Sequence, residues 1–333
     1  MKTDKILVTG GSGFIGTNLV AKLLEGGYNR IVNIDTAKPN LPEHDAYWQK
    51  ESILDKESIF KIFTSFQPDA VIHLAARTDT DPANVLSDYV INTTGTENLV
   101  AAIKAHPSVK RLILTSTQFV HQYKGMPQND EDFAPHTVYG ESKVMTEKLV
   151  RNAGLACIWT IIRPTNIWGP WHLRYPSEFW KVLSKGLYFH PGRQPVMRSY
   201  GYVGNVVAQV ISIMEGPREK VNKQVYYVGD EPIDLYDWAN GFSIGQIGKP
   251  VRVVPRFLVR GLALAGDVFA KIGLRFPITT SRYKSMTTSN VAPMEKTIEA
   301  FGQPPYSLQQ GILESVEWMR KYHPDLVRTR KAD

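Results

Sequence analysis

Tyr139 and Lys143 stand four residues apart in a helical pattern, so their side chains should project from the same face of a helix. A tyrosine hydroxyl has a pKa of about 10 and is a poor base near neutral pH. An ammonium group held beside it stabilises the phenolate and lowers that pKa. The pair is therefore suited to take a proton from a hydroxyl group while a hydride leaves the carbon that bears it.

Three consecutive hydroxyl side chains, Thr115, Ser116 and Thr117, follow an apolar stretch that is predicted to be a strand. In a parallel sheet, ligands bind outside the carboxyl ends of the strands. These hydroxyls would then face a ligand cleft, where one of them can hydrogen-bond the reacting oxygen atom. The alternative is a polar turn without such a role.

A glycine-rich loop lies between the apolar run Ile6–Val8 and a helical pattern that follows it, carried by Leu19, Val20, Leu23 and Leu24. A strand, a glycine turn and a helix start are the context that a dinucleotide-binding loop requires. Glycines let the backbone approach a pyrophosphate, and the helix N-terminus presents free N–H groups and a positive dipole to it. Two spacings fit the loop, one over Gly11, Gly13 and Gly16 and the other over Thr9, Gly10, Gly13 and Gly16.

Asp35 lies at the carboxyl end of the second predicted strand, nineteen residues after Gly16. A carboxylate at this place accepts hydrogen bonds from the adenosine ribose and repels a 2′-phosphate. The sequence therefore predicts NAD rather than NADP as the cofactor, and Lys38 nearby weakens this preference slightly.

Strand-like and helical patterns alternate along the first half of the chain, which predicts βαβ units and an α/β fold with a Rossmann-type, doubly wound parallel sheet. The further strands are predicted at Arg30–Asp35, Ala70–Leu74, Lys110–Thr115, Cys157–Ile162 and Gln224–Val228, and the helices at Lys56–Phe66, Asp88–Ala105 and Tyr139–Asn152. After Ile162, segments rich in Pro, Gly and Trp suggest loops and short helices that build a pocket. We expect a dinucleotide-binding domain over 1–164, to which 201–229 return, and a smaller, interleaved substrate-binding domain over 165–200 and 230–333.

The composition, 43% hydrophobic and 21% charged among 333 residues, is ordinary for a globular enzyme. The first strand pattern begins so close to Met1 that no signal peptide is expected, and a cytoplasmic location follows. The single cysteine, Cys157, cannot form an internal disulfide, and no Cys/His cluster suggests a metal site.

The net charge of +7 is unevenly distributed, with −3 over residues 1–150 and +10 over residues 151–333. Such asymmetry can indicate nucleic-acid binding. The positive charges are scattered, however, and no basic run with interleaved aromatic residues is present. We therefore expect no nucleic-acid partner. An anionic small substrate and a merely solvated basic surface fit the charge equally well.

The segment Arg256–Ile272 is predicted to be an amphipathic helix, bounded by Pro255 and Gly273. Its charged residues fall within about 60° of one another on a helical wheel, and the remainder is apolar or glycine. The segment is too interrupted by charge to span a membrane. It could lie on a membrane surface, line an apolar pocket or be a buried helix, and burial is the expectation.

The motifs taken together resemble the extended short-chain dehydrogenase/reductases, the NAD-dependent epimerase/dehydratase group, from Lys5 to about Arg320. The segments that carry the resemblance are Thr9–Gly16, His73–Ala76, Asn92–Leu99, Tyr139–Lys143, Arg163–Pro170, Arg198–Val203 and Tyr306–Ile312.

The resemblance implies a role for individual residues. Thr117, Tyr139 and Lys143 look like the catalytic triad, and Asn166 and Arg198 match positions that contact the substrate's diphosphate or sugar. Gly10, Gly13 and Gly16 are the glycines that should hold the pyrophosphate. The other residues expected around NAD are Phe14, Ile15, Asp35, Ser52, Ile53, Leu74, Ala75, Ala76, Asn92, Thr115 and Pro164.

The chain departs from the family pattern at three places. Ser52 replaces the usual Asp, which weakens the expected adenine contact, and Asn205 replaces a frequent Asp. Gln118 and Phe119 occupy the places of the acids that related dehydratases and decarboxylases use, so neither reaction is expected.

The resulting hypothesis is an NAD-dependent nucleotide-sugar epimerase, acting at C4 through a transient keto intermediate. One alternative is a dehydrogenase or reductase of a nucleotide sugar or of a 3β-hydroxysteroid-like alcohol. Another is a non-catalytic dinucleotide sensor. The resemblance also implies a homodimer, and no membrane partner is expected.

Overall fold

The computed structural model describes residues 4–121, 125–271, 273–274 and 278–328, which fall in two compact units. The first unit comprises Met1–Ile167, Val203–Gly229 and Ala292–Pro305, and the second comprises Trp168–Tyr202, Asp230–Val291 and Tyr306–Asp333. The chain therefore passes from one unit to the other five times. The range 292–305 lies in the first unit, whereas the sequence assigned the whole of 230–333 to the second.

A seven-stranded parallel sheet forms the centre of the first unit, in the order β11-β6-β5-β4-β1-β2-β3. Its strands are β1 (Ile6–Thr9), β2 (Ile31–Asp35), β3 (Trp48–Lys50), β4 (Ala70–His73), β5 (Arg111–Thr115), β6 (Ile158–Pro164) and β11 (Gln224–Val228). The strand order reverses between β1 and β4, which is where open α/β sheets bind ligands at the carboxyl ends of their strands. The predicted doubly wound α/β fold is confirmed.

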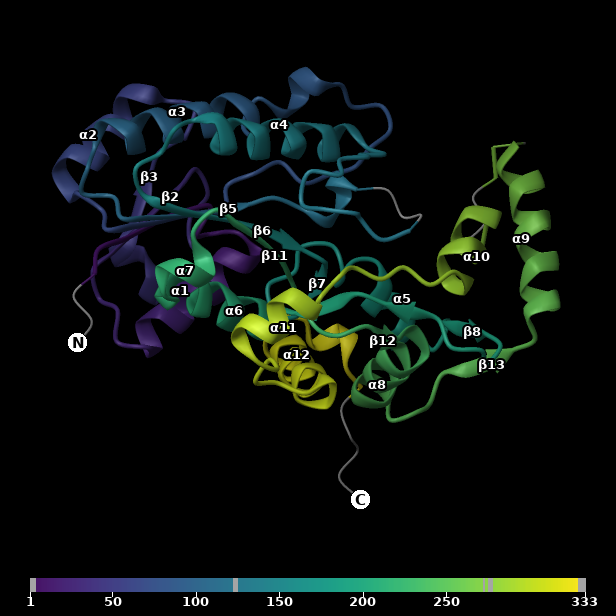
Figure 1. The fold of residues 1–333 in the computed structure, drawn as a ribbon. Helices are drawn as coiled ribbons and strands as arrows, with labels where there is room; N and C mark the ends of the chain where they lie inside the picture. The colour runs from purple at the N-terminus through teal and green to yellow at the C-terminus, as the bar shows by residue number, and fades with distance from the viewer. Residues whose placement is uncertain (1–3, 122–124, 272, 275–277, 329–333) are drawn as a thin grey trace. The chain divides into compact units, whose positions relative to one another are not determined.

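Helices cover both faces of this sheet (Figure 1). One face carries α2 (Lys56–Phe66), α3 (Thr93–Ala105) and α4 (Val138–Asn152), and the other carries α1 (Phe14–Glu25), α6 (Val203–Glu215) and α7 (Arg218–Val221). A buried apolar core, to which Leu7, Phe63 and Leu99 belong, joins the sheet to the first of these layers. The unit also contains η1 (Pro42–Tyr47), η2 (Leu86–Tyr89), η3 (Gln118–Val120) and α11 (Glu295–Phe301).

Most of the predicted elements in this unit have nearly the expected bounds. The helix Lys56–Phe66 begins where expected because the Asp55 carboxylate accepts a hydrogen bond from the Ser58 N–H at 3.0 Å. The predicted helix Asp88–Ala105 begins later, at Thr93, since a 3-10 turn precedes it. Strand β3 was missed because its three residues, Trp48–Lys50, include no apolar run.

The second unit is built from short strands and helices around a core of aromatic rings. Trp168 packs edge-to-face on Trp238 and Phe242, and Trp180 packs on Phe242. All four side chains are buried. Its elements are α5 (Phe179–Ser184), β8 (Phe189–Pro191), β9 (Met197–Arg198), β10 (Tyr200–Tyr202), β12 (Ile233–Asp234), α8 (Leu235–Ile247), β13 (Arg252–Val254), α9 (Arg256–Lys271), α10 (Thr280–Thr287), α12 (Leu308–Tyr322) and η4 (Pro324–Leu326), and β7 (Asn166–Trp168) spans the boundary along the chain.

Helix α9 forms as predicted, but its expected burial is wrong. Phe257 is 72% exposed, and the residues that the helix buries are Val259, Ala263 and Gly266. An apolar pattern shows which face of a helix could be covered, and it does not show that a partner covers it. The last residue of the predicted helix, Ile272, lies outside the described residues. No helix in the described part of the chain has the length and apolar character needed to cross a bilayer.

Candidate active site

The glycine loop leaves β1 and enters α1 with a backbone that only glycine can form. Gly10 has φ of +77°, and a Cβ there would lie 2.6 Å from the Ala75 backbone nitrogen. A Cβ on Gly16 would collide with the Gly10 carbonyl oxygen. The loop can therefore bring its backbone close to a ligand, and α1 begins at Phe14, with Gly13 as an N-cap that has no side chain to occupy the free N–H groups.

Asn33 of β2 fixes the middle of this loop. Its Oδ1 accepts a hydrogen bond from the Gly11 N–H at 2.8 Å, and its Nδ2 donates to the Ser12 hydroxyl at 3.1 Å. A Cβ on Gly11 would overlap Asn33. Gly11 is therefore required for packing against Asn33, while Gly10, Gly13 and Gly16 form the turn and the start of the helix. Asn33 was missed because a buried amide in a strand carries no motif.

Asp35 ends β2 beside the same loop. One carboxylate oxygen accepts a hydrogen bond from the Ser12 N–H at 3.1 Å, and the other accepts one from the Ala37 N–H at 2.9 Å. The carboxylate therefore has a fixed direction at the carboxyl edge of the sheet, where a ribose would present its hydroxyl groups.

A cavity of about 260 Å³ opens at this edge of the first unit. Eight residues that the sequence assigned to the cofactor line it, namely Gly10, Gly13, Asp35, Ser52, Ile53, Leu74, Ala75 and Ala76. It also includes Glu51 and Ile91, which the sequence analysis did not single out. The glycine cradle, the carboxylate at the ribose position and the apolar walls fit a dinucleotide such as NAD.

Phe14 and Ile15 are the first residues of α1 and are half-buried. Ser52 lies in the cavity wall, where its hydroxyl accepts a hydrogen bond from the Leu54 N–H at 3.2 Å. Neighbouring Ile53 is buried at 2% exposure. The serine at the place of the usual Asp thus forms a local turn, and it offers a hydroxyl in place of a carboxylate.

His73 ties the strand ends behind the loop together. Burial, with a smaller contribution from the charge on Lys143, lowers the pKa of His73 to about 3, so the ring is neutral at pH 7. Thr96 donates its hydroxyl proton to the Asn92 carbonyl oxygen, so at 3.0 Å it accepts from His73 Nε2–H. His73 Nδ1 is then the acceptor for the Thr9 hydroxyl at 2.6 Å. These hydrogen bonds link β1, β4 and α3, and no sequence motif predicted a separate role for His73.

Lys143 is a buried cation on α4, with its side chain directed at the end of β5. It is 2% exposed, and its Nζ donates a hydrogen bond to the Thr115 carbonyl oxygen at 2.8 Å. Burial lowers the pKa of Lys143 to about 8, and the Glu147 carboxylate one turn away opposes this shift. An ammonium group is thus held beneath the strand ends, where it favours a neighbouring anion.

Tyr139 lies one turn before Lys143, near the start of α4. The helix begins at Val138 because the Thr137 hydroxyl accepts a hydrogen bond from the Gly140 N–H at 3.0 Å. Tyr139 is 7% exposed, and its ring centroid lies 6.3 Å from that of Phe119. The spacing of four residues places Tyr139 and Lys143 on one helix face, as predicted.

The three hydroxyl residues after β5 have different surroundings. Thr117 is 5% exposed and caps η3, where its hydroxyl accepts a hydrogen bond from the Phe119 N–H at 3.3 Å. Ser116 donates its hydroxyl to the Glu147 carboxylate at 2.5 Å. The Thr115 hydroxyl is buried without a hydrogen-bond partner among the described residues. The Ser116 hydroxyl proton is thus used in the contact with Glu147, whereas the Thr117 hydroxyl only accepts a hydrogen bond among the described residues and keeps its proton for another acceptor.

A buried ion pair that the sequence analysis missed anchors α4 to the sheet. Arg163 of β6 donates from Nε and Nη2 to the two carboxylate oxygens of Glu147 at 2.9 and 2.8 Å. Both side chains are almost fully buried, at 1% and 0% exposure. Burial acts to lower the pKa of Arg163, but the hydrogen bonds and the charge of the Glu147 carboxylate outweigh burial and raise it. The guanidinium therefore remains charged. The signal available for this pair was an arginine directly after the predicted strand Cys157–Ile162, since charged residues that continue a buried strand are rarely buried unpaired.

Asn92 occupies the junction between the loop after β4 and α4. Its Oδ1 accepts from the Arg77 N–H at 2.8 Å, and its Nδ2 donates to the Arg77 carbonyl oxygen at 3.0 Å and to the Ser142 hydroxyl at 2.9 Å. Ser142 in turn donates to the Tyr139 carbonyl oxygen at 2.7 Å. Asn92 was expected to flank the cofactor, and the structure shows that its amide positions Arg77 and the turn that bears Tyr139.

The remaining predicted residues lie in both units. Pro164 ends β6 and is buried, and Asn166 begins β7 and is half-buried. Arg198 belongs to the second unit, where it pairs with Ile233 across the β9–β12 ladder and donates from Nη2 to the Ser285 carbonyl oxygen. Its Nε is buried without a partner among the described residues, so part of its hydrogen-bonding capacity is unused.

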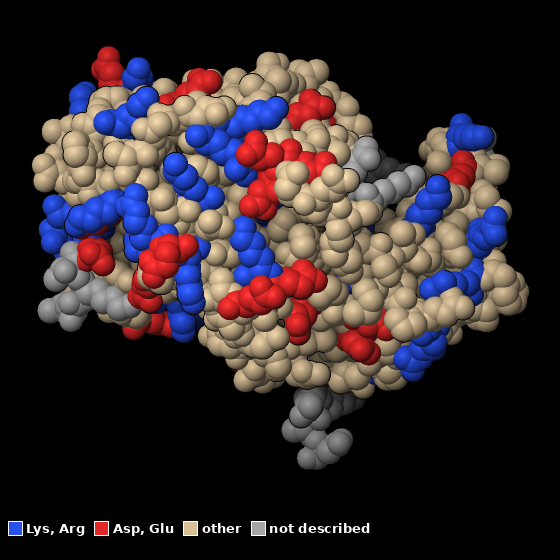
Figure 2. Space-filling model, viewed as in Figure 1, with Lys and Arg blue, Asp and Glu red and all other residues tan. Residues whose placement is uncertain are grey.

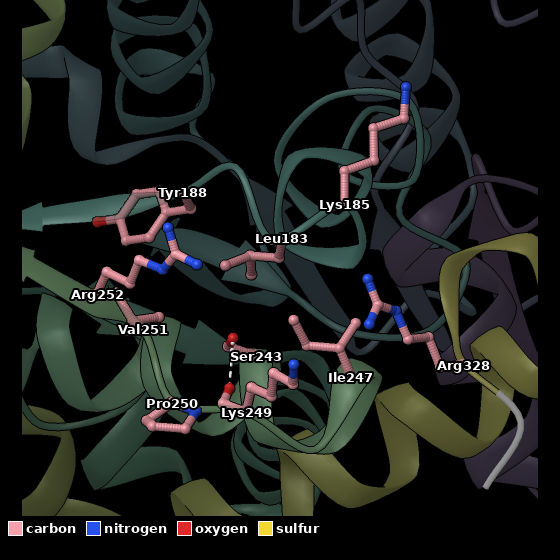
Figure 3. Close-up of a pocket in the computed structure, with 11 residues that line it drawn as sticks. Leu183, Lys185, Tyr188, Ser243, Ile247, Lys249, Pro250, Val251, Arg252 and Arg328 are labelled. Atoms are coloured by element: carbon pink, nitrogen blue, oxygen red, sulfur yellow. Dashed lines mark hydrogen bonds between the residues drawn. The ribbon is translucent and has the colours of Figure 1, made fainter. Parts of the chain in front are cut away.

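The second unit also contains a cation-lined cavity of about 160 Å³ that no motif predicted (Figure 3). Arg252 and Arg328 lie on opposite sides of it, with Leu183, Ser243 and Ile247 between them. Lys185 and Lys249 complete the set of four cations, and none of the described residues that line it is acidic. The excess positive charge of the second half of the chain is thus partly gathered at one place.

Known proteins resemble the chain along its whole length. A 3-beta-hydroxysteroid dehydrogenase of Mycolicibacterium neoaurum is 27% identical over 100% of this chain and 95% of its own. An N-acetyl-alpha-D-glucosaminyl-diphospho-ditrans,octacis-undecaprenol 4-epimerase of Escherichia coli O157:H7 is 26% identical over 99% of this chain and 98% of its own. The structure of UDP-glucose 4-epimerase from Thermotoga maritima with UDP-glucose, at 25% identity, superposes with a TM-score of 0.70 over 96% of this chain and 99% of that one.

Residues 6–229 match the sequence model described as the NAD dependent epimerase/dehydratase family. This range contains the glycine loop, the cavity lined by the residues predicted to bind the cofactor, and the Tyr139–Lys143 pair. The expected cofactor is NAD, and the residues present fit it. The chain therefore belongs to the NAD-dependent epimerase/dehydratase family of enzymes.

Proposed function

We propose that this enzyme is an NAD-dependent 4-epimerase of a nucleotide diphosphate sugar. The observation that carries the proposal is the buried Tyr139–Lys143 face of α4, in the same unit as a cavity that fits NAD. When bound, NAD would accept a hydride from the sugar carbon and supply it again.

Each residue of the proposed triad has a distinct task in this reaction. The Tyr139 phenolate takes the proton of the sugar hydroxyl while the C–H bond of the carbon that bears this hydroxyl breaks. A ketone forms at that carbon. The Lys143 ammonium, held on the Thr115 carbonyl, favours the phenolate form of Tyr139. Thr117 donates its hydroxyl to the reacting oxygen. In the return step Tyr139 gives the proton back to that oxygen, after the ketone has exposed its other face.

The choice of a sugar diphosphate as substrate has support from this chain and from its relatives. Two relatives along the whole chain carry the words 4-epimerase in their names, and one of them was solved with UDP-glucose. Arg198 retains an unpartnered buried Nε among the described residues, which suits an oxyanion ligand. Gln118 and Phe119 supply no acid, which disfavours dehydration and decarboxylation.

A second candidate is a dehydrogenase of an apolar secondary alcohol. Its support is the 3-beta-hydroxysteroid dehydrogenase that aligns with the entire chain, and the same triad would serve it. An alcohol without a diphosphate has no use for the guanidinium of Arg198. Arg198→Ala therefore separates the two, because turnover should collapse for a sugar diphosphate and remain unchanged for an apolar alcohol.

The decisive experiment incubates the purified protein with UDP-, GDP-, dTDP- and ADP-sugars and with 3β-hydroxysteroids, without added NAD, and follows products by NMR. A new C4 epimer with no accumulation of NADH supports the proposal. Stoichiometric NADH, or an absolute requirement for added NAD, refutes it. Tyr139→Phe is the matched control, since it removes the proton acceptor and should leave the NAD cavity intact.

A further inference from the structure

Helix α9 presents a continuous apolar face to solvent. At 100° per residue, its exposed large apolar side chains occupy an arc of about 160° without a charged residue inside it. They are Phe257, Leu258, Leu262, Leu264, Val268 and Phe269, with exposed fractions of 72, 49, 43, 56, 61 and 39%. Single exposed apolar residues are common on proteins, but a contiguous patch of this kind marks an interaction surface.

Cations border this face, and no free acid does so in the described part of α9. Arg260 and Lys271 are exposed and lie at one edge of the apolar arc. Asp267 accepts hydrogen bonds from the N–H and the hydroxyl of Thr280, so its charge is engaged within the unit. In the sequence, residues 249–288 contain eight Lys or Arg and one Asp. In Figure 2 the region of α9 and α10 is mostly tan, with several blue side chains and little red.

The helix is held firmly from its opposite side. Val259 and Ala263 are buried, at 0 and 1% exposure, and α9 packs on α10. Arg256 donates from Nε to the Pro191 carbonyl oxygen at 3.2 Å, which ties the start of the helix to β8. The apolar arc is therefore displayed by a fixed helix, and its side chains can be changed without opening the core of the unit.

We propose that α9 docks the protein on the surface of an anionic lipid bilayer. An amphipathic helix with a wide apolar face and basic residues at its edge lies in the plane of the interface, with the apolar side chains at the boundary between headgroups and acyl chains. Arg260 and Lys271 then reach the lipid phosphates. The sixteen residues of α9 carry charges and do not form a membrane-spanning helix, so the contact is peripheral.

Charge decides between a bilayer and a second copy of the chain. Two copies of this face packed together would bring Arg260 and Lys271 against a partner edge that also carries cations and offers no free carboxylate, which is unfavourable. An anionic bilayer supplies the opposite charge as well as an apolar phase. Docking on a bilayer does not depend on whether the enzyme is an epimerase or a dehydrogenase.

The test is co-sedimentation of the full-length protein with vesicles of equal parts phosphatidylglycerol and phosphatidylcholine, and with vesicles of phosphatidylcholine alone. We expect binding to the anionic vesicles that weakens as salt is added. Phe257→Ser with Val268→Ser should lower the partition coefficient by about tenfold or more, because two exposed apolar side chains leave the interface. Arg260→Gln with Lys271→Gln should weaken binding to the anionic vesicles and leave binding to the phosphatidylcholine vesicles unchanged. The matched control is Leu313→Ser on α12, which removes a side chain of similar exposure, 54%, from another helix.

Absence of the wild-type protein from both vesicle pellets overturns the proposal. So does equal loss of binding in Leu313→Ser and in the α9 variants. If Phe257→Ser with Val268→Ser leaves vesicle binding intact and converts a dimer to a monomer in sedimentation velocity, α9 is a self-association surface and the bilayer proposal is wrong. Circular dichroism of each variant shows whether it remains folded.

Discussion

Replacing Lys143 by Met tests the buried ammonium directly, through the pH dependence of stability. Burial lowers the pKa of Lys143 from 10.5 to about 8, so the folded state holds this proton less tightly than the unfolded state. At about 1.4 kcal/mol per pKa unit, carrying the charge costs about 3 kcal/mol of unfolding free energy at pH 7. The cost is fully present below pH 8 and disappears as the pH rises towards 10.5.

The quantity to measure is the difference in unfolding free energy between the wild-type protein and Lys143→Met, at pH 7 and at pH 9. Over this interval the wild type should gain about 1 kcal/mol relative to the variant. The variant leaves the Thr115 carbonyl oxygen without its donor, which costs about 1–3 kcal/mol, but that cost does not change with pH. The comparison between the two pH values therefore isolates the contribution of the Lys143 charge to the unfolding free energy.

Urea unfolding of the NAD-free proteins, followed by tryptophan fluorescence, provides the free energies. Lys148→Met is the matched control, because Lys148 is exposed on the same helix and its loss should shift both measurements equally. A difference between wild type and Lys143→Met that is constant from pH 7 to pH 9, or that moves against the wild type, refutes the depressed pKa. Activity of Lys143→Met should be lost at both pH values.

Three further changes test the rest of the site. Glu147→Gln leaves the Arg163 guanidinium buried without a carboxylate, and urea unfolding should show a loss of about 3–5 kcal/mol. Gly10→Ala drives a Cβ into the backbone at residue 75 and should weaken NAD binding about tenfold or more in calorimetry, whereas Gly27→Ala, which also has positive φ but open space around it, should leave NAD binding unchanged. Tyr139→Phe should lower kcat by about 10²–10⁴-fold with unaltered NAD affinity, and retained turnover would exclude it as the proton acceptor.

Local signals in the sequence were sufficient for most of the first unit. Gly10, Gly13 and Gly16 follow from the covalent geometry of a tight turn, and the helix Lys56–Phe66 follows from its cap and its apolar spacing. The carboxyl ends of parallel strands must meet at one edge, so the loop, Asp35 and the residues after β4 could be placed together before their contacts were known.

Features that depend on distant partners could not be predicted in this way. Glu147 follows Lys143 by four residues and so lies on the same face of α4, but its charge partner becomes evident only when Arg163 is brought to it from β6. The apolar residues of α9 have the pattern of a core helix, and their exposure depends on what the rest of the chain places beside them. Helix α11 returns to the first unit without any motif to mark it.

That return of α11 governs how the protein can be made and divided. The first unit is complete only when residues 292–305 have been synthesised, after most of the second unit has already left the ribosome. The first unit therefore cannot complete its folding during synthesis before the second unit begins to fold, as a leading domain does in vectorial folding. For the same reason neither unit can be excised as one continuous stretch, and an exchange of substrate specificity between relatives would require several segments to be grafted at once.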